Sequence, residues 1–128
     1  MIYLDASVAL AHLLAEDRQP PAALWSETLV SSRLLEYEAW TRLHARGLAR
    51  SHTEPLRALL GRIAFLEVIP EVVARMLDPF PTPVRTLDAL HLASIEFIRS
   101  QGQTLRLAAY DARLIQAAKA LKIELFAV

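Results

Sequence analysis

The chain carries two kinds of hydrophobic pattern. Short runs of apolar, β-prone residues predict strands, and apolar positions spaced three and four residues apart predict helices that bury one face. Ile2-Tyr3-Leu4 is a run of the first kind, and Ala6 to Glu16 is a stretch of the second, with apolar residues at 6, 9, 10, 13 and 14. We therefore predict a strand followed by a helix at the start of the chain.

The same patterns continue to the end of the chain, without repeats or low-complexity segments. Further strands are predicted at 29–30, 65–69, 105–110 and 123–128. Further helices are predicted at 21–27, 33–45, 53–64, 71–77, 86–100 and 112–121. Ser31 and Ser32 stop the second strand and can cap the next helix, Pro55 lies in the first turn of its predicted helix, and Thr86 can cap the longest one. Three prolines make 78–84 an extended connector.

Strands that alternate with helices, without hairpin turn signals, predict an α/β fold with a parallel sheet covered on both faces. In such sheets ligands bind past the carboxyl ends of the strands, where the strand order reverses. Asp5 directly follows the first predicted strand and Asp111 follows the strand at 105–110. We therefore expect these two carboxylates at one site.

The length of 128 residues predicts one domain, residues 1–128. The absence of cysteine excludes disulfides, thiolate nucleophiles and thiolate metal sites. The longest uncharged run, Ala6 to Ala15, has ten residues, about half of what a membrane span needs. With no basic leader at the start, we expect no membrane segment and a cytoplasmic protein.

The formal net charge is zero, with 14 basic and 14 acidic residues, which by itself speaks against a polyanionic partner. The balance changes if some acids belong to a metal site. Without four such acids, 10 acidic residues face 14 basic ones. Because 12 of the basic residues are arginine, whose planar fork suits phosphate, we expect weak RNA affinity without a metal and a marked gain with it.

Two more carboxylates lie at positions that a purely structural role explains less well. Asp88 stands in the first turn of a largely apolar helix, where its alternative role is a favourable charge at the helix N-terminus. Glu38 could simply pair with Arg42 one turn on. Four converging carboxylates would repel one another unless a cation is present, and oxygen-only ligands suit Mg²⁺ or Mn²⁺. Such ions support phosphodiester hydrolysis.

The motifs around these acids occur in a recognisable order. They are Ile-Tyr-Leu-Asp5-Ala-Ser7, Ser32-Arg-Leu-Leu-Glu-Tyr-Glu38-Ala, Arg85-Thr-Leu-Asp88-Ala-Leu-His91-Leu-Ala and Ala109-Tyr-Asp111-Ala-Arg-Leu. Together they resemble the PIN-domain ribonucleases, and most of all the short toxins of VapBC toxin–antitoxin modules. The resemblance covers residues 2 to about 126.

The resemblance implies a five-stranded parallel sheet and an endoribonuclease whose Mg²⁺ is held by Asp5, Glu38, Asp88 and Asp111. Ser7 matches a hydroxyl residue that supports the first acid or its metal-bound water. The family also implies an RNA substrate, an antitoxin that covers the acidic groove, and a homodimer.

Two positions near these motifs need comment. Glu36 competes with Glu38, but residues two apart on a helix point about 200° apart, and the family spacing matches Glu38. Ala109 departs from the pattern, since relatives commonly carry Thr or Ser there, and this could loosen the orientation of Asp111.

Other polar side chains receive less specific roles. His91, one turn after Asp88, is interpreted as a packing residue whose ring nitrogens find hydrogen-bond partners. Arg42, Arg85 and Arg113 lie within four residues of proposed ligands, and we expect them to contact substrate phosphate or antitoxin, or to form local ion pairs. Arg46 and Arg50 are assigned to a solvated helix face.

Two alternatives remain open beside the toxin hypothesis. One is a housekeeping RNA-processing PIN nuclease, and the other is a non-catalytic PIN module that only binds RNA or protein. A phosphoacceptor receiver is disfavoured because only one acid follows the first strand and the two lysines come at 119 and 122.

Overall fold

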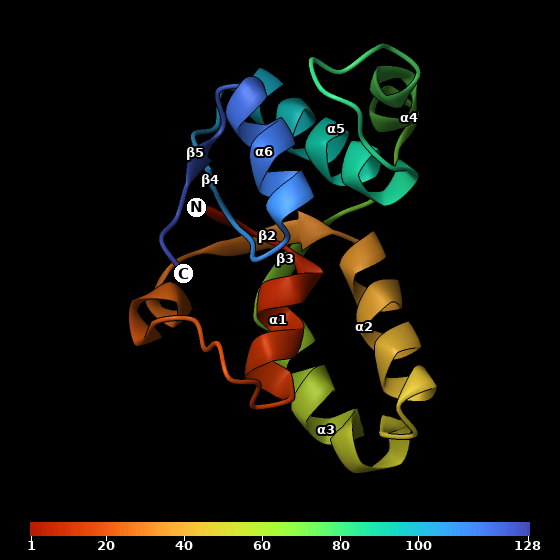
Figure 1. The fold of residues 1–128 in the computed structure, drawn as a ribbon, viewed down its shortest axis with the longest axis vertical. Coiled ribbons are helices and arrows are strands. Elements are labelled where there is room, and N and C mark those ends of the chain that lie inside the picture. The colour runs from red at the N-terminus through yellow and green to blue at the C-terminus, as the bar shows by residue number, and fades with distance from the viewer.

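The computed structural model describes residues 1–128 and contains a five-stranded, all-parallel sheet flanked by helices (Figure 1). The strand order is β3-β2-β1-β4-β5. The strands are β1 (Ile2–Leu4), β2 (Leu29–Ser32), β3 (Ile63–Leu66), β4 (Arg106–Ala108) and β5 (Glu124–Leu125). The predicted α/β class with a parallel sheet of five strands is confirmed.

The strand β1 lies at the centre of the sheet. Its residue Ile2 stands opposite Leu29 of β2 on one side and opposite Arg106 of β4 on the other. The chain builds outward from β1 to β3 and then returns to add β4 and β5 on the opposite side. The strand order therefore reverses between β1 and β4, and a parallel sheet leaves a crevice at such a point.

Helices cover both faces of this sheet (Figure 1). The layer with α1 and α3 lies on one face, the layer with α5 and α6 lies on the other, and α2 packs beside α1. The helices are α1 (Ala6–Leu13), α2 (Leu34–Ala45), α3 (Ala49–Leu60), α4 (Pro70–Met76), α5 (Thr86–Ser100) and α6 (Ala112–Ala120), with a 3₁₀ helix at Ala22–Ser26.

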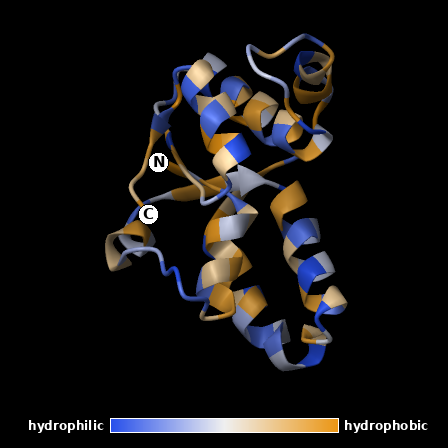
Figure 2. Ribbon diagram, in the orientation of Figure 1, coloured by the Kyte–Doolittle hydropathy of each residue, from blue (hydrophilic) through white to orange (hydrophobic).

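The core has two halves because side chains of β1 alternate between the faces of the sheet. Tyr3 packs with Leu92 and Leu107 on the side of α5 and α6. Ile2 and Leu4 pack on the side of α1 and α3. Figure 2 shows the hydrophobic residues along α1 and α5, which bracket this central strand. A fully buried β1 gives the residue that follows it a fixed position.

Two predicted elements around residues 49–69 are displaced. The helix predicted at 53–64 is α3, which begins at Ala49 because a three-residue turn with Gly47 at φ 67° connects it directly to α2. Pro55 therefore lies inside the helix and not in its first turn. The strand predicted at 65–69 is β3, which starts earlier because Ile63 is buried and pairs with Leu29.

Smaller differences occur at element ends. β2 runs through the two serines predicted to stop it, since the buried Ser31 hydroxyl donates to the Leu4 carbonyl oxygen (2.8 Å). The hydroxyl of Ser32 accepts from the Leu34 backbone N–H at 3.1 Å, so it does help to begin α2. Arg85, and not Thr86, occupies the N-cap position of α5, and its backbone N–H donates to the carboxylate of Asp88. β4 and β5 are shorter than predicted, and none of the helices is long and apolar enough to cross a membrane.

Candidate active site

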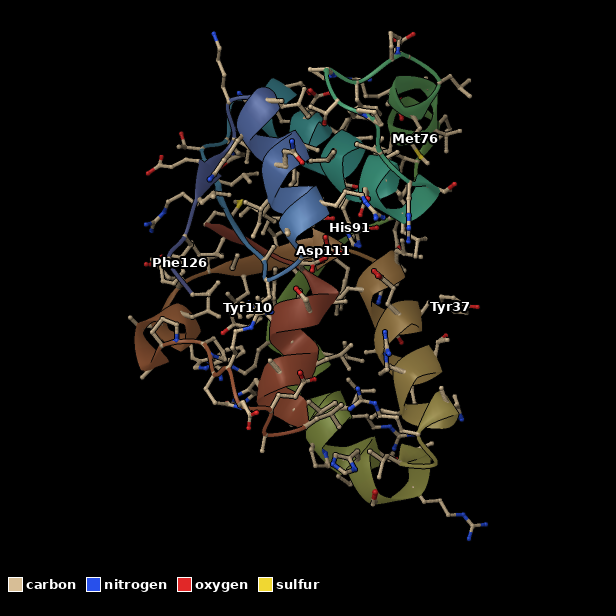
Figure 3. The ribbon with its side chains drawn as sticks, in the orientation of Figure 1. Tyr37, Met76, His91, Tyr110, Asp111 and Phe126 are labelled. Carbon is tan, nitrogen blue, oxygen red and sulfur yellow. The ribbon has the colours of Figure 1, made fainter.

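A cleft of about 540 Å³ opens where the strand order reverses, past the carboxyl ends of β1 and β4. Elements far apart in the sequence meet there, and Figure 3 shows His91 and Asp111 beside the N-terminal end of α1. We name this cleft the acidic cleft. All eight side chains singled out from the sequence line it: Asp5, Ser7, Glu38, Arg42, Arg85, Asp88, Asp111 and Arg113.

Asp5 is the most deeply placed of the four acids, with 6% of its surface exposed. It is the N-cap of α1, and its Oδ2 accepts from the Ser7 backbone N–H (3.1 Å) and the Ser7 hydroxyl (2.5 Å). Burial raises the pKa of Asp5, and His91 and the two Ser7 hydrogen bonds only partly oppose this effect. The position of Asp5 follows from β1, because the strand ends one residue before it.

Glu38 extends from α2 towards α5 and does not pair with Arg42. Its Oε1 accepts from Nε2 of His91 at 2.6 Å, and Nδ1 of His91 lies 2.7 Å from the Tyr3 hydroxyl. The same hydroxyl accepts from the Ser32 backbone N–H at 3.1 Å. A chain of hydrogen bonds therefore runs from the sheet through a histidine that is 2% exposed to a carboxylate of the cleft.

His91 is buried, and both of its ring nitrogens have hydrogen-bond partners. This agrees with its interpretation as a packing residue. Burial alone would lower its pKa, but the hydrogen bond and charge of Glu38, together with Asp5 and Asp88, raise the pKa above its usual value. The sequence did not reveal the connection to Tyr3 and Glu38. The one signal in the sequence was the spacing of His91 and Asp88, which lie one turn apart on α5 and so place His91 near the predicted site.

The remaining two acids belong to helix N-termini. Asp88 is half-buried in the first turn of α5 and accepts from the Arg85 backbone N–H at 3.3 Å. Asp111 is exposed and caps α6, with Oδ1 accepting from the backbone N–H groups of Arg113 (2.9 Å) and Leu114 (3.1 Å). Its orientation is therefore set by its own capping bonds, while Ala109 lies buried in the core.

Helix α2 separates the two glutamates that competed for the site. Glu36 forms an ion pair with Arg33 at 2.8 Å, and Arg33 also pairs with Glu67 at 2.7 Å. Glu38 lines the acidic cleft and Glu36 does not. The two glutamates therefore extend from different faces of α2, as the helical geometry that favoured Glu38 predicted.

The rim of the acidic cleft carries positive and apolar groups. Arg42, Arg85 and Arg113 line it, and none of the three lies within ion-pair distance of a carboxylate. Tyr37 and Leu87, which are 67% and 47% exposed, line it as well. The sequence analysis did not identify these two residues, because a hydrophobic pattern predicts buried positions and cannot show which apolar residues are exposed.

The chemistry of the donor set fits a hard cation. All four acids present carboxylate oxygens, and none of them is paired with a lysine or arginine. As placed, no three histidine or acidic side chains are close enough to form a complete metal centre. Carboxylates gathered around a buried one are nevertheless the ligands that Mg²⁺ and Mn²⁺ take in proteins.

A parallel α/β sheet with an acidic cleft at its switch point defines the class of this protein as an α/β domain built around a carboxylate site. Comparison with known families then identifies the chain. It belongs to the PIN domain family, which matches residues 2–120. The resemblance seen in the sequence motifs is thereby confirmed.

Curated relatives agree with this assignment over the full length. The chain is 29% identical over 133 residues to the protein named Ribonuclease VapC35 from two strains of Mycobacterium tuberculosis, CDC 1551 / Oshkosh and ATCC 25618 / H37Rv. The match covers 99% of this chain and 96% of each relative. The chain is thus a distant, full-length homologue of a VapC ribonuclease.

Proposed function

We propose that this protein is a Mg²⁺-dependent endoribonuclease and the toxin of a type II toxin–antitoxin system, acting in the cytoplasm. The observation that carries the proposal is the presence of four carboxylates in one cleft, none of them paired with a lysine or arginine. Membership of the PIN family and the name of the relative, a ribonuclease, support it.

The polar residues singled out from the sequence have distinct roles in this proposal. Asp5, Glu38, Asp88 and Asp111 would hold Mg²⁺, with Mn²⁺ as a substitute. When bound, such an ion lowers the pKa of water and offsets charge on phosphate oxygens. Ser7 fixes the carboxylate of Asp5 through its hydroxyl.

Further side chains orient the site or meet the substrate. His91, which also lines the acidic cleft, orients the carboxylate of Glu38 through their hydrogen bond. Arg42, Arg85 and Arg113 would contact RNA phosphates or an acidic segment of an antitoxin, since no carboxylate of this chain neutralises them.

The toxin role adds two partners. We propose a cognate antitoxin that covers the acidic cleft, for which the exposed Tyr37 and Leu87 at its rim supply apolar contact area. We also propose a homodimer, following the family. A housekeeping RNA-processing nuclease would share the same site, and a neighbouring short reading frame that encodes a DNA-binding antitoxin would distinguish the toxin from it.

The test of the proposed activity is cleavage of single-stranded RNA with Mg²⁺, with EDTA, and by the Asp5→Asn variant. Asparagine caps a helix as well as aspartate does, so this variant should fold. We expect cleavage with Mg²⁺ alone, leaving 5′-phosphate and 3′-hydroxyl ends. Cleavage that persists in EDTA and in the variant would refute the metal-site hypothesis, and no cleavage under any condition would favour a non-catalytic binding module.

A further inference from the structure

A second pocket, of about 220 Å³, opens beside the acidic cleft. It is bordered by α1, by α2 and by the segments that follow α1 and β4. Ser7, Leu10 and Arg42 line both hollows, so the two adjoin. We name the second one the arginine pocket, after the three basic side chains that line it, Arg18, Arg42 and Arg46.

The charge of the arginine pocket is not balanced. Arg18, Arg42 and Arg46 form no ion pair, and Glu16 is the one acidic residue in the lining. Arg46 is the C-cap of α2 and follows Arg42 by one turn, so the two side chains leave the end of the helix close to each other. Arg46 is exposed, as its assignment to a solvated helix face predicted, and it also lines this pocket with two other arginines.

Tyr110 adds an unmet hydrogen-bonding group. It lies beside α1 (Figure 3), with the guanidinium of Arg18 4.3 Å from its ring centroid. Its hydroxyl is buried and has no hydrogen-bond partner, although the residue lines the pocket. Buried polar groups are nearly always paired. The Tyr110 ring thus forms the part of the pocket wall against which Arg18 lies.

The chemistry of this pocket selects a phosphate. Guanidinium groups match the oxygens of phosphate in a planar, often bidentate arrangement. A ligand that occupies both hollows must present one anionic group to the carboxylates and their cation and another to the arginines. Single-stranded RNA has this property, because its phosphates repeat along the chain.

We infer that the arginine pocket binds a backbone phosphate that flanks the scissile phosphate of the RNA, a step that rests on the proposed function. Arg42 stands between the two hollows, and Arg18 and Arg46 hold the flanking phosphate. The pocket thus fixes the register of the strand across the acidic cleft without reading bases.

The test measures RNA binding in a background that does not require cleavage. Asp5→Asn protein is titrated with a single-stranded oligoribonucleotide at several salt concentrations, alone and with Arg18→Gln or Arg46→Gln added. Arg50→Gln, an exposed arginine of α3 that lines neither hollow, is the matched control. Thermal unfolding of each variant checks that the fold is retained.

We expect each pocket variant to weaken binding about tenfold and to reduce the slope of log affinity against log salt by about 0.7, the value for one phosphate contact on a single strand. The control should change neither quantity beyond the error. Equal losses in the pocket variants and in Arg50→Gln would overturn the inference, as would unchanged binding or the absence of any RNA binding.

The outcome is separable from that of the proposed function. Binding that depends on Arg18 and Arg46 in a chain that never cleaves RNA would refute the nuclease and keep the phosphate pocket. Cleavage by the unmodified chain, with binding that is indifferent to both arginines, would do the opposite.

Discussion

Ser7 and Tyr110 are joined by a hydrogen bond across 103 positions of sequence, in which the Ser7 hydroxyl accepts from the Tyr110 backbone N–H at 3.0 Å. The same hydroxyl donates to Asp5. One small side chain therefore connects the carboxylate after β1 to the segment that leads from β4 to Asp111. The two aspartates of the switch point are held in register by this bridge.

Replacing Ser7 with alanine should remove both bonds at once. We expect RNA cleavage to fall about 10- to 100-fold, the usual cost of losing a residue that orients a metal ligand. The unpaired N–H of Tyr110 should lower the free energy of unfolding by about 1–3 kcal/mol. Cleavage rates and thermal unfolding measure the two effects. Ser51→Ala, at an exposed hydroxyl on α3, is the control, and equal behaviour of the two variants would contradict the bridge.

Glu38 and Glu36 provide a matched pair on one helix. Glu38→Gln keeps a hydrogen-bond acceptor for His91 but removes a charge from the acidic cleft, so cleavage should fall at least 100-fold. Glu36→Gln removes the same charge from an exposed ion pair with Arg33 and should leave cleavage within twofold. Initial rates at saturating Mg²⁺ decide the matter. Similar losses in both variants would show that net charge, and not position, matters.

Tyr3 should matter for stability through its hydroxyl. Tyr3→Phe leaves Nδ1 of His91 and the backbone N–H of Ser32 without their buried partner, and we expect a loss of about 1–3 kcal/mol in the free energy of unfolding. Tyr37→Phe, at an exposed side chain, should change this free energy by less than about 0.5 kcal/mol. Urea unfolding measures both. A Tyr3→Phe protein as stable as the unmodified chain would contradict the role given to the hydrogen-bond chain.

Mg²⁺ should stabilise the folded protein even without RNA. A ligand that binds only the folded state at 100 times its Kd adds about 2.7 kcal/mol, so the unfolding midpoint should rise with Mg²⁺ concentration. Asp5→Asn should remove most of this rise, and NaCl of equal ionic strength should not reproduce it. Calorimetry provides the readout. An unfolding midpoint of the unmodified chain that does not change with Mg²⁺ concentration would contradict the cation site.

Periodicity predicted the elements whose patterns are strongest. The helix from Thr86 to Ser100 has the predicted bounds, because Thr86 opens it, Gly102 follows its end and its apolar residues fill the core between. The helix α3 was displaced because contact with α1 and α2 outweighs the local signal of Pro55. Tertiary packing decided where local preference was weak.

The candidate site divides in the same way. Asp5 and Asp111 were predictable because strand ends in a parallel sheet have a known place. The contact of His91 with Tyr3 and Glu38 depends on how α2 and α5 pack around the sheet, and the pocket that contains Arg18 and Arg46 depends on how α2 packs beside α1. The distances between side chains on different helices cannot be read from the sequence alone.

The central place of β1 also determines when the site can exist during synthesis. β1 is made well before its second neighbour, β4, which ends at residue 108. Pairing of such distant segments is slow, because a long loop must close before the contacts form. Asp5 therefore cannot meet Asp111 until residue 111 has been translated. A nascent chain consequently lacks its complete acidic cleft until about 100 residues after Asp5 have been made.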